Sequence, residues 1–134
     1  MDAHPIRDFF ALDARGVAKY AWHDAERFYV DPAAVPAEQA ARTKGNMATM
    51  RIIAGPEMSD PKLMRRLARV RIPTLAIWGD SDGIVTPDYG AAFAGAFQNG
   101  RLEVIKEAGH LPQIEQPAAT LAVIDAFVNA AGRG

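Results

Sequence analysis

The amino-acid sequence predicts an α/β fold with two parallel strands, and three observations in its second half predict it. Residues 74–78 form a short apolar run bounded by proline and glycine, and residues 102–106 form a second, alternating strand pattern. The segment between them is long enough for a helix, which a crossover between parallel strands requires. A second helical pattern follows residue 117, so residues 73–134 are expected to run strand, helix, strand, helix.

Residues 1–71 precede this pattern and are predicted to be helical. Apolar side chains recur at roughly helical spacing over residues 16–28, and a proline-started helix is expected over residues 36–53. Asp60 and Pro61 have the residue types of an N-cap and a first helical turn, so they predict a third helix.

The elements of the second half are expected to differ in burial. Residues 74–78 are predominantly apolar, which is typical of a buried strand, whereas residues 102–106 alternate and are expected nearer an edge. Pro87 and Pro117 suit the first turns of the two helices. The inward face of the last helix is expected to hold Leu121, Ile124, Phe127 and Val128.

The composition excludes several classes of protein. The 134 residues carry 15 Lys and Arg against 16 Asp and Glu, and a net charge of -1 gives no global field that would attract nucleic acid or an anionic membrane. The absence of cysteine excludes disulfides, thiolate metal sites and cysteine nucleophiles. No apolar run reaches the ~18 residues of a membrane helix, and the N-terminus has no secretory h-region. A cytoplasmic protein of one domain is the simplest interpretation.

Two polar loops follow the carboxyl ends of the predicted strands. Residues 79–83 read Gly-Asp-Ser-Asp-Gly, and residues 108–112 read Ala-Gly-His-Leu-Pro. Sites of parallel α/β sheets form at this end of the strands. We therefore expect Asp82 and His110 to meet, in the arrangement that lets a carboxylate hold an imidazole in one tautomer and stabilise its cation.

The first loop also reads G-x-S-x-G, which allows a second interpretation with Ser81 as a nucleophile. A nucleophile elbow needs a helix directly after the serine, but here the helix is expected to start only at Thr86-Pro87. It also needs an acid after a further strand, and residues 82–109 have room for only one helix and one strand. We therefore favour Asp82 as the acid and Ser81 as its neighbour.

Metal binding is a third interpretation of this loop. Asp80 and Asp82 fit the first ligands of a calcium loop, but Ile84 stands at the third ligand position and the terminal Glu is missing. A receiver-like phosphoacceptor or metal pocket would need more acids from an earlier strand, and Lys106 lies inside a strand. We expect no metal and no cofactor.

The segments IPTLAIWGDSDGIVTPDYG and LEVIKEAGHLPQIEQP carry a more specific pattern. Together they resemble the C-terminal segment of the α/β-hydrolase superfamily, in its cap-bearing esterase, meta-cleavage-product hydrolase and haloperoxidase-like branch. The residues that match are Pro73, Leu75, Gly79, Asp82, Pro87, Gly109, His110, Glu115 and Pro117. The resemblance implies that residues 72–134 are a core segment of that fold and that residues 1–71 are a remnant of its helical cap, or lid.

The resemblance also implies roles for individual residues. Asp82 would be the carboxylate of a Ser-His-Asp triad, and His110 the base that activates a serine and later a water. Val85 and Leu111 would line the acyl pocket. Trp22 would line a substrate pocket under the lid, although we favour packing within the cap for this residue. The substrate would be a small-molecule ester or a compound with a C–C bond next to a carbonyl, and haloalkane dehalogenation and cofactor-free haloperoxidase reactions are sister chemistries.

Two further residues are expected to have local roles only. Glu115 is interpreted as a local cap or structural acid, and His23 as a surface residue.

The nucleophile of such an enzyme is missing from these motifs. The only serines are Ser59, which precedes a helix, and Ser81. We therefore expect the acid-and-histidine end of a serine-type hydrolase, inactive alone, whose N-terminal half lies upstream or in a separate chain. A two-stranded parallel sheet would also leave one strand edge open. The alternative is a non-catalytic binding module that pairs with a partner, or with itself, through that edge.

Overall fold

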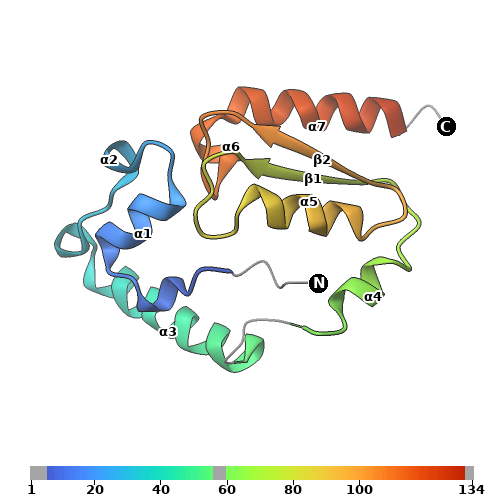
Figure 1. Cartoon of the computed structure of the whole chain (residues 1–134). Helices are drawn as coiled ribbons and strands as arrows, with labels where there is room; N and C mark the ends of the chain where they lie inside the picture. The colour runs from blue at the N-terminus through green and yellow to red at the C-terminus, as the bar shows by residue number, and fades with distance from the viewer. Residues whose placement is uncertain (1–5, 56–59, 132–134) are drawn as a thin grey trace.

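The computed structural model describes residues 6–55 and 60–131, and it has the expected α/β architecture (Figure 1). The first half is helical, with η1 (Phe9–Ala11), α1 (Ala14–Ala21), α2 (Ala25–Phe28), η2 (Pro32–Ala34), α3 (Ala37–Ala54) and α4 (Leu63–Leu67). Four of these elements begin with an aspartate whose side chain accepts a backbone N–H of the first turn. Ser59 lies outside the described residues.

The helix expected over residues 16–28 is interrupted at Trp22. The backbone of Trp22 is extended, with φ -120° and ψ 144°, and Asp24 then caps α2. The last carbonyl groups of a helix have no partner inside it. Here the carbonyl groups of Tyr20 and Ala21 instead accept hydrogen bonds from the two loops that follow the strands. The interruption therefore attaches the first half of the chain to the sheet.

The second half alternates strands and helices, as predicted. Its elements are β1 (Thr74–Gly79), α5 (Pro87–Gly95), β2 (Gly100–Ile105), α6 (Pro112–Glu115) and α7 (Pro117–Ala131). The strands are parallel, with Thr74 opposite Gly100 and Gly79 opposite Ile105. Figure 1 shows α5 and α7 on opposite sides of the two strands. Both strands therefore end at the same edge of the sheet, where their loops can meet.

Aromatic side chains of α5 pack on β1. The ring centroid of Trp78 lies 6.3 Å from that of Phe93 and 6.2 Å from that of Tyr89. Gly90 permits this approach, because a Cβ at that position would lie 2.7 Å from the Trp78 ring. The packing fixes α5 beside the carboxyl end of β1, close to the loop that carries Asp82.

The inward face predicted for the last helix is wrong in three of its four residues. In α7, Leu121 and Val128 are 57% and 60% exposed, and Ile124 is exposed as well. Phe127 is half-buried, while the polar Thr120 is buried. A sheet of two strands is too narrow to cover the apolar surface of a helix of 15 residues. Leu121, Ile124 and Val128 therefore form an apolar stripe on α7 that stays exposed.

Candidate active site

Asp82 is a buried carboxylate at the carboxyl end of β1. The residue is only 6% exposed, and its Oδ1 accepts hydrogen bonds from the backbone N–H groups of Ile84 and Val85, each at 2.9 Å. Its other oxygen, Oδ2, lies 2.9 Å from Nδ1 of His110. A buried charge is tolerated when its oxygens are hydrogen-bonded in this way. The two predicted site residues are therefore in contact.

The loop that carries Asp82 is held from several sides. The indole Nε1 of Trp78 donates to the carbonyl oxygen of Val85 at 2.7 Å, inside the loop. The N–H of Gly83 donates to the carbonyl oxygen of Tyr20 at 2.8 Å, and the Arg7 guanidinium donates to the carbonyl oxygen of Gly83 at 3.0 Å. Arg7 also lies over the Tyr20 ring, 3.7 Å from its centroid. The residues before α2 thus contribute directly to the acid loop.

His110 follows β2 and presents its imidazole to Asp82. Because a carboxylate can only accept hydrogen bonds, Nδ1 carries the proton and Nε2 of the neutral ring holds a lone pair. The hydrogen bond to Asp82 raises the pKa of His110, partial burial opposes this, and the charge of Asp82 raises it further. The His110 side chain is 42% exposed. A basic Nε2 with access to solvent is what a general base requires.

Glycine residues bring the two loops together. A Cβ on Gly79 would collide with the carbonyl oxygens of Ala108 and Gly109, and a Cβ on Gly109 would collide with the carbonyl oxygen of Ala21. The N–H of His110 donates to that same carbonyl of Ala21 at 2.7 Å. Three backbone segments therefore lie in direct contact beneath the Asp82–His110 pair.

Ser81 has hydrogen-bond partners that do not suit a nucleophile. Its Oγ donates to Oδ1 of Asp80 at 2.9 Å, and Nδ1 of His23 lies 2.8 Å from the same Oγ. The Ser81 hydroxyl has a single proton, which it uses in the hydrogen bond to Asp80. The imidazole of His23 must therefore donate to the Ser81 oxygen. An imidazole that donates to a serine cannot withdraw its proton. This geometry favours Asp82 over Ser81 as the functional residue of the loop.

Asp80 stabilises this arrangement as an anion. Burial raises its pKa, but hydrogen bonds from the Ser81 side chain and the Ala108 backbone, together with Lys106, lower it more, so that the net pKa of Asp80 is lowered. Nζ of Lys106 lies 3.6 Å from Oδ2 of Asp80. Asp80 therefore stays ionised and accepts the hydrogen bond from the Ser81 hydroxyl across the neutral pH range.

His23 is exposed, as predicted, but its contact with Ser81 was not predicted. The two residues are 58 positions apart, and no sequence pattern relates them. Glu115 agrees better with its expected structural role. Its carboxylate accepts the backbone N–H groups of His23, Asp24 and Gly109.

The three predicted substrate-binding residues lie at different places around this centre. Val85 and Leu111 are half-buried and belong to the acid loop and to the start of α6. Trp22 stacks on Phe28 with ring centroids 4.9 Å apart, a contact within the helical first half of the chain. 

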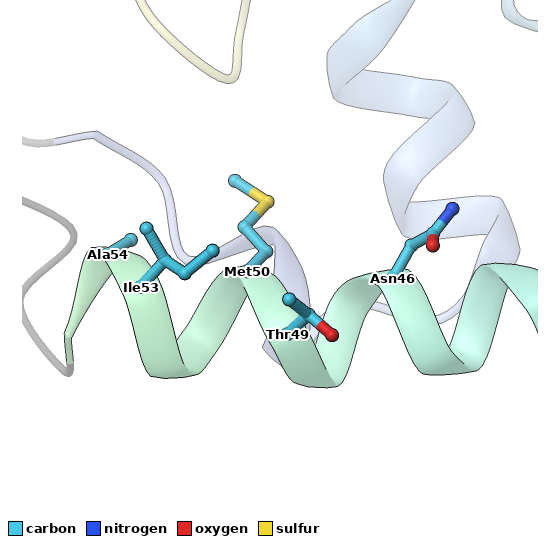
Figure 2. Close-up of a pocket in the computed structure, with 5 residues that line it drawn as sticks. All are labelled: Asn46, Thr49, Met50, Ile53 and Ala54. Carbon is cyan, nitrogen blue, oxygen red and sulfur yellow. The ribbon is translucent and has the colours of Figure 1, made fainter.

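Two pockets lie elsewhere among the described residues, and none of these three residues lines either of those two. One, of about 350 Å³, runs along a face of α3 that is lined by Asn46, Thr49, Met50, Ile53 and Ala54 (Figure 2). The other, of about 190 Å³, lies near the Glu115 carboxylate. Its lining residues are His23, Asp24, Arg27, Phe28, Glu107, Glu115 and Gln116.

Metal-binding clusters and membrane-spanning helices are absent from the part of the chain that the structure describes. No group of three or more His, Asp or Glu side chains in residues 6–55 and 60–131 is arranged to hold a metal ion. Within the same ranges, no helix is both long enough and apolar enough to cross a membrane.

Comparison with known proteins gives one family and several related folds. The family described as alpha/beta hydrolase fold matches residues 16–117. A serine hydrolase involved in carbazole degradation, CarC, is 23% identical with a TM-score of 0.59, over 78% of this chain and 42% of that one. A thermophilic esterase is 15% identical with a TM-score of 0.56, over 98% and 52% of the two chains.

A third solved structure, Rv0554 from Mycobacterium tuberculosis, is 22% identical with a TM-score of 0.50, over 81% of this chain and 48% of that one. The chain thus spans about half the length of the solved proteins that it resembles. The search of curated proteins gave no match.

Proposed function

Because the chain belongs to the α/β-hydrolase family, we propose that Asp82 and His110 are the acid and the base of a Ser-His-Asp type hydrolase. The observation that carries the proposal is the 2.9 Å contact between Nδ1 of His110 and Oδ2 of a buried Asp82. The substrate would be a small-molecule ester, or an acyl compound cleaved at a C–C bond next to a carbonyl.

In the ester reaction, Nε2 of His110 takes the proton of a serine hydroxyl while the serine oxygen attacks the substrate carbonyl carbon. The imidazolium that forms keeps its Nδ1–H on Asp82, and the negative charge of Asp82 stabilises it. Nε2 then gives the proton to the leaving alcohol oxygen, which leaves an acyl-serine. The same nitrogen activates the water that releases the carboxylic acid and regenerates the serine.

The nucleophile in this proposal comes from outside the described residues. The Ser81 hydroxyl donates a hydrogen bond to Asp80, and the solved relatives are about twice as long as this chain. We propose that a complementary segment, upstream in a longer protein or in a separate chain, supplies the serine and pairs with the open edge of β1. The 134-residue chain alone would then be inactive.

The first half of the chain has a proposed role as part of a lid. Residues 1–71 would be the remnant of a cap over the acyl site, with Val85 and Leu111 lining that site from below and Trp22 facing it from the cap. The contacts of Tyr20 and Ala21 with both loops support a fixed position for this segment.

Ester hydrolysis with defined variants tests the function. The chain alone is expected to hydrolyse short-chain nitrophenyl esters no faster than buffer, whereas the protein extended by its upstream coding segment should hydrolyse them. Activity of the extended protein should disappear in H110A. If the 134-residue chain is active alone and S81A abolishes that activity, the assignment of Asp82 and the external serine is wrong.

A non-catalytic binding module is the second candidate, and the sheet itself favours it. In the described residues β1 pairs only with β2, so its other edge is open to a further strand. An isolated chain that is monomeric, melts cooperatively and gains no esterase activity from the upstream segment would support this candidate. Insolubility without the upstream segment would count against it.

A further inference from the structure

Glu115 joins the residue directly before the proposed base to a distant segment of the chain. Its Oε2 accepts the N–H of Gly109, the residue directly before His110. Its Oε1 accepts the N–H groups of His23 at 2.9 Å and of Asp24 at 3.1 Å, more than 90 positions away in the sequence. One half-buried carboxylate thus provides the acceptor for three backbone donors.

The segment that Glu115 holds also reaches the loop of the proposed acid. The side chain of His23 donates to Ser81, which is adjacent to Asp82, and the carbonyl group of Tyr20 accepts the N–H of Gly83. Residues 20–24 therefore lie across both loops, and Glu115 is the side chain that ties this segment to the backbone before His110.

We propose that Glu115 is a positioning residue that sets the contact between His110 and Asp82 by holding Gly109 and residues 20–24 in place. Its hydrogen-bond donors are backbone N–H groups, so it acts through the backbone. Chemically, the role requires a carboxylate. Glutamine offers one acceptor oxygen and replaces the other with an NH₂ donor, which faces at least one N–H group without accepting it. The inference rests on the proposed roles of Asp82 and His110.

Titration of His110 followed by NMR tests this role without needing a substrate. The measurement uses the whole 134-residue chain, and the His110 signal is assigned by its absence from H110Q. The variants are E115Q, D82N and the double variant E115Q/D82N. E107Q is the matched control, because it removes an equal charge from an exposed neighbour whose carboxylate has no hydrogen-bond partner among the described residues.

The positioning role predicts that E115Q lowers the pKa of His110 toward its ordinary value and that E107Q leaves it unchanged. In the D82N background, E115Q should have no further effect, because the contact through which it acts is already lost. If E115Q is folded and leaves the pKa of His110 at its wild-type value, the proposal is wrong. It is equally wrong if E115Q lowers that pKa by the same amount with and without Asp82, because Glu115 would then act by its charge alone.

E115D keeps the test decisive if E115Q does not fold. It retains the charge but shortens the side chain, so it cannot reach both segments, and it should also lower the pKa of His110. An unchanged pKa of His110 in folded E115D would overturn the proposal.

In an extended protein with esterase activity, E115D should reduce kcat about 10- to 100-fold with little change in KM. An inactive extended protein would refute the proposed function and leave the NMR result standing.

Discussion

The backbones of Gly79 and Gly109 lie in contact at the point where the two strands end. Gly79 is the last residue of β1, and a side chain there would overlap the carbonyl oxygen of Gly109. The next residues on each side lead to Asp82 and His110. The absence of a side chain at Gly79 therefore lets the loops of the proposed acid and base approach each other.

Replacement of Gly79 by alanine is expected to destabilise the chain. The new Cβ has no space between β1 and the 108–109 backbone, and overpacking of this kind costs about 1–3 kcal/mol. Urea denaturation gives the free energy of unfolding. Gly45→Ala is the control, because nothing lies within 4 Å of a Cβ there and α3 should gain about 0.5–1 kcal/mol. Equal stability of Gly79→Ala and the wild-type chain would contradict the close contact.

The pairing of His110 with Asp82 predicts a dependence of stability on pH. The pKa of His110 is raised in the folded state, so the folded chain binds the proton more tightly than the unfolded chain. The resulting stabilisation is complete below the unfolded pKa of about 6.5 and is lost as the pH rises through the folded pKa. Urea midpoints measured between pH 5 and 9 should therefore decrease as the pH rises above about 6.5. In D82N this decrease should be smaller. The same slope in D82N would show that another group causes it.

Ser81→Ala separates the two interpretations of the acid loop. It removes the hydrogen bonds to His23 and Asp80 but leaves every hydrogen bond of Asp82 in place. We expect the NMR titration of His110 to be unchanged and the esterase activity of the extended protein to remain. Loss of that activity in folded Ser81→Ala would identify Ser81 as part of the reaction.

Asp82→Asn is expected to have a large effect on the reaction of the extended protein. The amide no longer stabilises the imidazolium and can favour the wrong tautomer of His110, which lowers kcat by about 10⁴-fold in the best-studied serine triad. Nitrophenyl ester hydrolysis measures the change, with circular dichroism to confirm the fold. A loss of less than tenfold would exclude Asp82 as the triad acid.

The open stripe on α7 gives a test of the proposed complementary segment. Val128→Lys should leave the unfolding of the isolated chain nearly unchanged, because Val128 is already exposed. It should weaken assembly with a separately expressed upstream segment, measured by co-purification. Ala126→Lys, two residues away on a different face of the same helix, is the control. Equal assembly of both variants would show that the stripe is not covered by that segment.

Much of the fold could be predicted because its signals are local. The apolar run of β1, the proline at the start of α5 and the glycines after each strand are readable from a few neighbouring residues, and the parallel pairing follows from the length between the strands. The Asp82–His110 contact was predictable for the same reason, since both residues leave the sheet at one edge.

The rest depended on contacts between distant parts of the chain. Trp22 interrupts a helical pattern because the carbonyl groups before it are used by Gly83 and His110, which local spacing does not reveal. The burial of α7 was mispredicted because the apolar pattern shows only which residues are able to be buried. The two-stranded sheet is too narrow to cover all of them. The link between His23 and Ser81 has no local signal at all.

The hydrogen bonds of Glu115 also set the order in which the site can form during synthesis. Its partners His23 and Asp24 are 92 and 91 positions earlier in the chain. These amides leave the ribosome long before the carboxylate that they require, and closing such a long loop is slow compared with forming a local helix. The two strands and α5 can assemble before Glu115 is made, and the N–H groups of His23 and Asp24 gain this acceptor only afterwards. A nascent chain interrupted before α6 would therefore lack the carboxylate that accepts the N–H groups of His23, Asp24 and Gly109.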